Sequence, residues 1–224
     1  MRHKTNIMTR SGFEFDLIDP SKNRFTVEDI AHALSNTCRY CGHVSEFFSV
    51  AQHSVMVSRL VPEQHAMIGL MHDASEAFIG DVAKPLKELL PDYKQVEARI
   101  EEFVLGRFGI DPHHMPPDIK RADMIALLTE QRDLMHGPDK DVMKKWNIEP
   151  LQEKIIPLSP KEAKELFLER YREIKYLRIH EEKSHRHSSK EVLGGVRAAI
   201  YDPEVDDIIS MAAGNPSRKP GLNR

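Results

Sequence analysis

The sequence predicts an all-α protein that begins with a short hairpin or extended arm. Apolar residues recur at helical spacing through most of the 224 residues, and several of these segments begin with Ser, Thr or Pro, which are typical of helix N-termini. Only residues 6–20 alternate polar and apolar side chains, around a Ser-Gly turn. Hydrophobic residues make up 40% and charged residues 30% of the chain, which indicates a soluble globular protein with a core.

The first helices are placed by the residues that can cap them. Thr26 precedes an apolar-periodic segment, and Asp29 stands at the third helical position, where a capping box usually has Glu or Gln. A second helix is expected over residues 49–61, ahead of a proline. A third is expected over residues 63–80 as one continuous helix that stops at a glycine.

Three more helices are expected in the second half of the chain. They cover residues 85–110, with a bend at Pro91, then residues 116–135, and then residues 159–182, where a serine cap is followed by a proline at the first helical position.

The domain organisation follows from composition. Residues 1–24 are expected to form the N-terminal arm and residues 25–180 the helical domain. Beyond them the chain becomes polar and poor in core residues, so we expect a flexible tail over residues 181–224.

Charge and composition argue against several classes of protein. The net charge is −3, which gives no basic footprint for nucleic acid, and no apolar run approaches the ~18 residues of a membrane span. The N-terminus lacks the apolar core of a signal peptide, so a cytoplasmic protein is expected. The sequence leaves a homodimer or higher homo-oligomer open.

The two cysteines invite a metal or redox interpretation that the rest of the chain does not support. Cys38 and Cys41 form a C-x-x-C pair followed by His43, but a structural zinc site takes four ligands and no second pair exists. A redox motif of this kind would follow a strand, whereas residues 26–35 are expected to be helical. We therefore interpret both cysteines as packing residues.

Four ionisable residues lie within a strongly apolar segment. His72 and Asp73 are adjacent, Glu76 follows one helical turn after His72, and Asp81 comes at the end of the segment. Burying charges without partners is costly, and a divalent cation that binds imidazole and carboxylates would offset that cost.

Other helices must supply further ligands, because adjacent residues on a helix diverge by about 100°. His53 shares the expected core face of its helix with Val50 and Val57, and Asp123 precedes an apolar run on a later helix. Each residue alone has an ordinary interpretation, as a hydrogen-bonded core histidine or as an aspartate favourable near a helix start. Their joint pattern indicates a metal site.

Together, His53, the pair His72-Asp73 and Asp123 resemble the H…HD…D signature of the HD-domain metal-dependent phosphohydrolases, which are helical bundles. The segment HDASEAFIGDVAKPLK, residues 72–87, is similar to the HD-type 5'-deoxynucleotidases and their phage-associated relatives, in which HDxxE is followed by Gly-Asp and a proline-lysine region. The resemblance covers about half of the chain.

This resemblance implies specific roles. The four signature residues would bind the metal, and Glu76 matches the position that acts on the attacking water. Asp81 matches an acidic residue at the sugar, and Arg39 matches a phosphate-binding arginine that Lys84 could assist. Tyr40 stands where the deoxynucleotidases carry a tryptophan, so the sugar preference stays open.

These roles predict a phosphohydrolase in which a divalent metal lowers the pKa of its water and Glu76 takes the proton. The ligand types favour cobalt, manganese, zinc or nickel over magnesium. Few cations accompany Arg39, which favours (deoxy)nucleoside 5'-monophosphates as the substrates that release phosphate. Two alternatives remain: a deoxynucleoside triphosphate triphosphohydrolase of the same fold, and a non-catalytic nucleotide-binding regulatory module.

Overall fold

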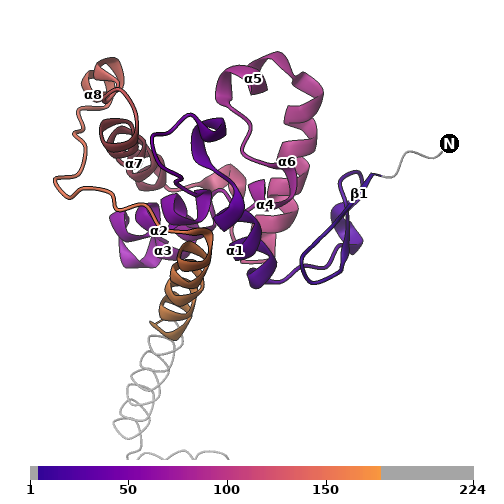
Figure 1. The fold of residues 1–224 in the computed structure, drawn as a ribbon. Helices are drawn as coiled ribbons and strands as arrows, with labels where there is room; N and C mark the ends of the chain where they lie inside the picture. Colours follow the sequence, from indigo (N-terminus) through magenta and orange to yellow (C-terminus); the bar gives the residue numbers. More distant parts are fainter. Residues whose placement is uncertain (1–4, 178–224) are drawn as a thin grey trace, which may run out of the picture. The chain divides into compact units, whose positions relative to one another are not determined.

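Residues 5–177, the part of the chain that the computed structural model describes, form helices joined by loops and one two-stranded hairpin (Figure 1). The prediction of an all-α fold with a short N-terminal hairpin is confirmed. Strand β1 (Asn6–Met8) pairs antiparallel with β2 (Glu14–Asp16). The tail predicted over residues 181–224 and the domain boundary predicted at residue 180 lie outside the described residues.

The helices follow one another with short connections. They are α1 (Val27–Asn36), α2 (Val50–Leu60), α3 (Ala66–Met71), α4 (Glu76–Ile79), α5 (Lys84–Leu89), α6 (Pro91–Gly106), α7 (Pro117–Leu134) and α8 (Lys140–Trp146), with a further helical segment over residues 160–177. Four 3-10 turns join them, namely η1 (Pro20–Lys22), η2 (Arg39–Gly42), η3 (Glu63–His65) and η4 (Pro112–His114).

The predicted starts of the first two helices agree with the structure. Thr26 and Asp29 form the full capping box of α1, and Ser49 accepts a hydrogen bond from the backbone N–H of Gln52 at the start of α2. The bend predicted at Pro91 is a break between α5 and α6, because proline cannot donate the hydrogen bond that would continue the first helix.

The prediction of one continuous helix over residues 63–80 is wrong. The chain forms η3, α3 and α4 there, and residues 72–75 form a turn between α3 and α4. The side chain of His72 donates from Nδ1 to the carbonyl of Gly69 at 2.8 Å, and several backbone N–H groups beyond Met71 bond three residues back. The His-Asp pair therefore lies in a tight turn, where a local hydrogen bond orients the ring of His72.

Helix α8 was not predicted from the sequence. It spans seven residues, mostly charged, and starts at Asp139, whose carboxylate accepts from the backbone N–H groups of Asp141 and Val142. A short helix with little apolar periodicity gives almost no signal in the sequence.

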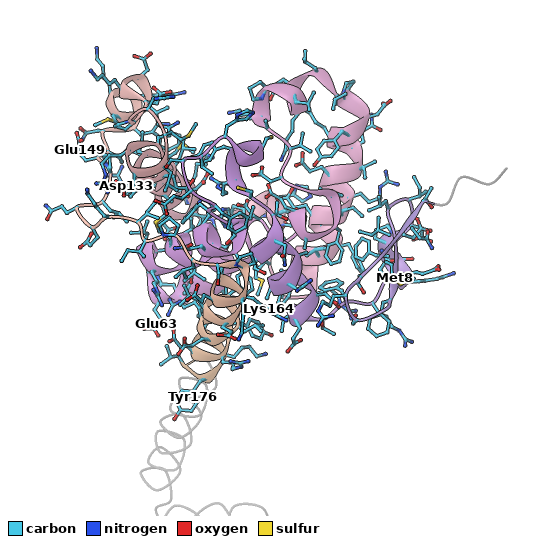
Figure 2. The ribbon with its side chains drawn as sticks, viewed as in Figure 1. Met8, Glu63, Asp133, Glu149, Lys164 and Tyr176 are labelled. Carbon is cyan, nitrogen blue, oxygen red and sulfur yellow. The ribbon has the colours of Figure 1, made fainter. Side chains whose placement is uncertain are left out.

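The hairpin is attached to the helices by its aromatic residue. Phe15 of β2 is fully buried and stacks on Phe78 of α4, with ring centroids 3.9 Å apart. Phe25 meets Phe78 edge-on. Met8 of β1 is 65% exposed (Figure 2), so the hairpin buries one of its faces.

Helix α2 packs against α1, α3 and α7 (Figure 1), and the candidate metal site lies where these elements meet. Gly69 of α3 permits the close approach to α2, because a Cβ at that position would lie 3.0 Å from the Cα of Ser58. This contact brings the end of α3, and therefore His72, next to α2. None of the helices within residues 5–177 is both long and apolar enough to cross a membrane.

Candidate metal centre and its cavity

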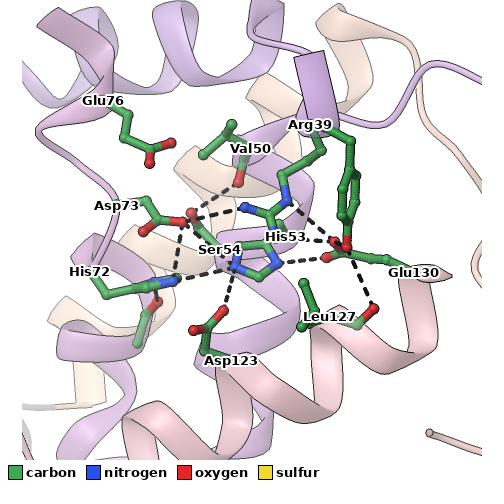
Figure 3. A network of polar contacts seen from close by, with 12 residues as sticks. Arg39, Val50, His53, Ser54, His72, Asp73, Glu76, Asp123, Leu127 and Glu130 are labelled. Carbon is green, nitrogen blue, oxygen red and sulfur yellow. Dashed lines mark hydrogen bonds and ion pairs between the residues drawn. The ribbon is translucent and has the colours of Figure 1, made fainter. Parts of the chain in front are cut away.

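The four residues of the predicted signature converge on one point (Figure 3). His53 comes from α2, His72 and Asp73 from the turn after α3, and Asp123 from α7. Donor atoms of His53, His72 and Asp123 all lie within 4.8 Å of one another. Asp73 is not part of this group but lies beside its two histidines, with Oδ2 3.2 Å from Nε2 of His72 and 3.6 Å from Nε2 of His53.

The imidazole rings of His53 and His72 face each other through their Nε2 atoms. Nε2 of His53 and Nε2 of His72 are 3.3 Å apart. Nδ1 of His72 faces the carbonyl of Gly69, which can only accept, and Nδ1 of His53 lies 2.6 Å from a carboxylate oxygen of Glu130. In neutral rings both Nδ1 atoms therefore carry the protons, and two Nε2 lone pairs face each other. A cation between them resolves that arrangement.

The spacing of the donor atoms fits a single ion. Ligand atoms placed ~2.0–2.2 Å from a common ion lie roughly 3–3.5 Å from each other in tetrahedral or octahedral geometry. Nε2 of His53 lies 3.4 Å from Oδ1 of Asp123, and the distances to His72 and Asp73 are similar. The donor set fits a divalent metal, with His53, His72 and Asp123 as the group that could hold it.

The electrostatics of this point also favour a cation. Burial and the charge of Arg39 lower the pKa of His53, but Glu130 and Asp123 outweigh them and raise it to about 9. Burial raises the pKa of Asp123, yet His53 and His72 hold it well below its usual value. The carboxylates thus remain ionised in a setting that strongly attracts positive charge.

Glu130 is a residue of the site that the sequence analysis missed. Its side chain has no exposed surface and accepts hydrogen bonds from Arg39, Tyr40 and His53. Burial raises its pKa, but Arg39 and His53 outweigh burial and lower the pKa below its ordinary value, so the carboxylate is ionised. Its position, seven residues or two helical turns after Asp123, is the signal that could have placed it on the same face of α7.

Arg39 and Tyr40 reach the site from the turn η2. Arg39 donates from Nε and Nη2 to Glu130, and its Nη1 lies 4.0 Å from Asp73. Tyr40 and Cys41 both have left-handed backbone conformations, with φ of 55° and 54°. For residues other than glycine this costs roughly 1–2 kcal/mol each, so the contacts of Arg39 and Tyr40 with Glu130 hold a strained turn.

Glu76 points toward the metal centre but is poorly paired (Figure 3). Its Oε2 is buried without a hydrogen-bond partner among the described residues, and its Oε1 lies 3.9 Å from Nζ of Lys87. Burial raises its pKa well above the ordinary value, and the charges of Asp73 and Asp81 add to the effect. A buried carboxylate with a raised pKa and a free acceptor oxygen is typical of a general base.

A cavity of about 720 Å³ opens next to these groups. Arg39, Tyr40, Asp81 and Lys84 line it, as do the ligand candidates Asp73 and Asp123. The structure thus brings the predicted substrate-binding residues to one cavity beside the predicted ligands. The same cavity is lined by Cys41, which is exposed and free, and the donor group contains no cysteine.

Three lysines of the cavity wall were not predicted: Lys87, Lys94 and Lys120. Each forms an ion pair with a carboxylate, namely Lys87 with Glu97, Lys94 with Glu88 and Lys120 with Asp123. Lys84 makes no ion pair with another described residue and is exposed. Much of the positive charge on this wall is therefore already neutralised.

Comparison with known proteins shows the family. YfdR of Escherichia coli (strain K12) is 43% identical to the chain over 177 residues, which make up 77% of this chain and 97% of that protein. The chain belongs to the YfdR family. A Rhodobacter capsulatus protein is 35% identical over 122 residues, or 50% of this chain and 62% of that protein. Both are described as uncharacterized.

A third relative carries a functional description. A 5'-deoxynucleotidase of Vibrio atlanticus is 33% identical over 67 residues, which are 28% of this chain and 34% of that protein. No family model matches the chain. The relation to YfdR thus spans nearly a whole protein, whereas the similarity between this member of the YfdR family and the deoxynucleotidase is partial.

Proposed function

We propose that the protein is an HD-type, metal-dependent phosphohydrolase that releases phosphate from (deoxy)nucleoside 5'-monophosphates. The observation that carries the proposal is the convergence of two imidazole Nε2 atoms with the carboxylates of Asp73 and Asp123 beside a cavity lined by Arg39. The partial similarity to a 5'-deoxynucleotidase supports it.

His53, His72, Asp73 and Asp123 would hold the ion. Imidazole and carboxylate ligands in equal number suit manganese, cobalt, nickel or zinc better than magnesium, which prefers oxygen ligands. When bound, such an ion supplies Lewis-acid chemistry and lowers the pKa of a coordinated water.

Glu76 is the group proposed to take the proton of the attacking water. Its unpaired oxygen and raised pKa suit a base that works near neutral pH. Lys87, near its other oxygen, orients the carboxylate. Asp81, whose pKa is raised by burial, lines the cavity where a sugar hydroxyl would donate to it.

Arg39 is proposed to bind the phosphate through Nη1, because Nε and Nη2 each already donate to Glu130. A triphosphate carries about four negative charges and needs several unpaired cations. Lys84 is the cavity lysine that forms no ion pair within residues 5–177, so the charge balance favours a monophosphate.

Apolar side chains also line the cavity and would pack against a base. Val82, Ala83 and Pro85 line it together with Met124 and Leu127. A volume of about 720 Å³ lies within the range of pockets that hold small organic ligands.

Product analysis tests the proposal. The protein is stripped of metal, reloaded with Mn²⁺ or Co²⁺, and incubated with deoxynucleoside mono- and triphosphates while ³¹P NMR identifies the products. We expect inorganic phosphate from the monophosphates. Intact triphosphate released from a deoxynucleoside triphosphate would indicate a triphosphohydrolase instead, and binding without any product would indicate a regulatory module.

Glu76→Gln is the matched control for that assay. It should abolish phosphate release while Mn²⁺ or Co²⁺ still binds, because the residue is assigned to water and is not assigned as a ligand. Full turnover in this variant would remove Glu76 from the proposed mechanism.

A further inference from the structure

Glu130 lies behind the metal centre, out of reach of any substrate. Its side chain has no exposed surface, and it does not line the cavity. The proposed reaction assigns it no step. A fully buried carboxylate is nevertheless costly to maintain, so its hydrogen bonds indicate what it does.

Both oxygens of Glu130 are occupied, and by different parts of the site. Oε1 lies 2.6 Å from Nδ1 of His53. Oε2 accepts from Nε and Nη2 of Arg39 at 3.2 and 3.1 Å and from the hydroxyl of Tyr40 at 2.9 Å. Three donors thus meet Oε2 and one meets Oε1, and the side chain has no surface exposed to water or substrate.

We propose that Glu130 is a positioning residue that fixes the ring and tautomer of the metal ligand His53 with one oxygen and holds the phosphate-binding Arg39 with the other. The inference rests on the proposed function. It adds that one side chain sets the positions of both the metal ligand His53 and the phosphate-binding Arg39. Histidine ligands of metals usually donate their second ring N–H to such a group, which turns the bare nitrogen toward the ion.

The hydrogen-bond inventory shows why a carboxylate is needed. A glutamine side chain has the same shape but only one acceptor oxygen. Arg39 has no acceptor, so the amide oxygen of a glutamine would turn toward Arg39 and its NH₂ group toward Nδ1 of His53. That nitrogen would then have to accept, and the ring proton would move to Nε2, the atom that faces His72 and Asp123.

The same helix carries a matched control. Asp118, near the start of α7, lies 2.7 Å from Nδ1 of His65 in η3. Neither residue belongs to the group of converging metal donors. Asp118→Asn makes the same chemical change to a histidine–carboxylate pair as Glu130→Gln, but to a pair outside the group of donors.

Titration calorimetry with Co²⁺ on the full chain tests the proposal. We expect Glu130→Gln to weaken Co²⁺ binding ~10–100-fold while circular dichroism shows the helices intact. The Co²⁺ affinity of Asp118→Asn should stay within about twofold of the wild type, whereas that of Glu130→Gln should fall ~10–100-fold. Equal affinity in Glu130→Gln and the wild type would overturn the proposal. Stoichiometric Co²⁺ binding by a wild type that hydrolyses no nucleotide would overturn the proposed function and leave this inference standing.

A second measurement needs no variant. In the Zn²⁺-loaded wild type, ¹⁵N NMR of the histidine rings should show His53 protonated at Nδ1 and metal-bound through Nε2. A proton on Nε2, or metal bound through Nδ1, would contradict the assignment of Glu130 even if the glutamine variant failed to fold.

Discussion

Two carboxylates of α7 each hold the Nδ1 atom of a histidine, at nearly equal distance and in very different surroundings. Glu130 and His53 are 2.6 Å apart and have no exposed surface. Asp118 and His65 are 2.7 Å apart, and each side chain is about a third exposed, at 30% and 29%. The contact distance is therefore a poor guide to what a pair does, and burial and further partners decide it.

The partners differ in the same way. The second oxygen of Glu130 accepts from Arg39 and Tyr40, whereas Oδ1 of Asp118 is buried without a hydrogen-bond partner among the described residues. One pair belongs to a network that reaches the metal donors and the cavity. The other joins two elements, η3 and α7, at a single point.

Replacing each carboxylate by alanine should give the largest difference between the two pairs. Glu130→Ala removes the hydrogen-bonded partner of the buried Arg39 and leaves it only the 4.0 Å contact with Asp73, so we expect a loss of about 3–5 kcal/mol in the free energy of unfolding. Asp118→Ala should cost about 1 kcal/mol or less, because a partly exposed ion pair is screened by water. Urea denaturation of both variants measures the difference, and equal losses would show that the network adds nothing.

Glu76 sharpens the comparison, because it is a buried carboxylate that lacks the partners of Glu130. Its Oε2 has no hydrogen bond within residues 5–177, and its pKa is raised where that of Glu130 is lowered. Glu76→Gln should lower kcat by ~100-fold or more with little change in unfolding free energy. Steady-state kinetics with metal content measured in parallel checks this, and a large stability loss with normal kcat would reverse the two roles.

The proposed metal ligands were predictable and their supporting residues were not. His53, His72, Asp73 and Asp123 carry a spacing that is readable in the sequence. Glu130 stands among polar residues near the end of α7, where a solvated side chain is the ordinary expectation. Its burial depends on η2 packing against α7. The conformation of η2 includes two residues with left-handed backbone angles, which the local sequence does not predict.

The helix over residues 63–80 shows the same limit. Its apolar pattern continues through His72 and Asp73, so periodicity alone predicts an unbroken helix. At the break the ring of His72 bonds to the carbonyl of Gly69, a contact that periodicity does not reveal. The lysines of the cavity wall were missed for a related reason, since the directions of Lys87, Lys94 and Lys120 depend on how three helices pack.

Tyr40 tests how much of the network depends on its neutral member. Tyr40→Phe removes the hydroxyl that donates to Glu130 at 2.9 Å, while both bonds from Arg39 remain. We expect a loss of about 1.5 kcal/mol in unfolding free energy, which is smaller than for Glu130→Ala. Thermal and urea unfolding measure it. A loss as large as that of Glu130→Ala would mean that the hydroxyl, and not the charge, holds η2.

Asp29 is a well-paired carboxylate remote from the metal centre, and its effect should be the smallest and depend on pH. Burial raises its pKa, but hydrogen bonds from Ser11 and Thr26 outweigh this and lower it. Because the folded pKa lies below the unfolded value of ~3.9, the ionised group stabilises the fold above that pH, and this stability is lost as pH falls through the folded pKa.

Asp29→Asn should therefore cost about 1 kcal/mol at pH 7, as loss of a helix cap does. The difference from the wild type should shrink below about pH 4, where the unfolded carboxylate becomes protonated. Unfolding free energies measured from pH 7 down to pH 3 check this. A difference that stays constant across that range would mean that the charge of Asp29 contributes nothing.

Metal content measured together with hydrolysis tests the central claim most directly. The wild type, stripped with a chelator and titrated with Mn²⁺ or Co²⁺, should bind one ion per chain, and phosphate release from a deoxynucleoside monophosphate should rise in proportion to occupancy. Asp123→Ala should hold no stoichiometric ion and release no phosphate. Full activity in the chelated protein, or one tightly bound ion in Asp123→Ala, would contradict the account.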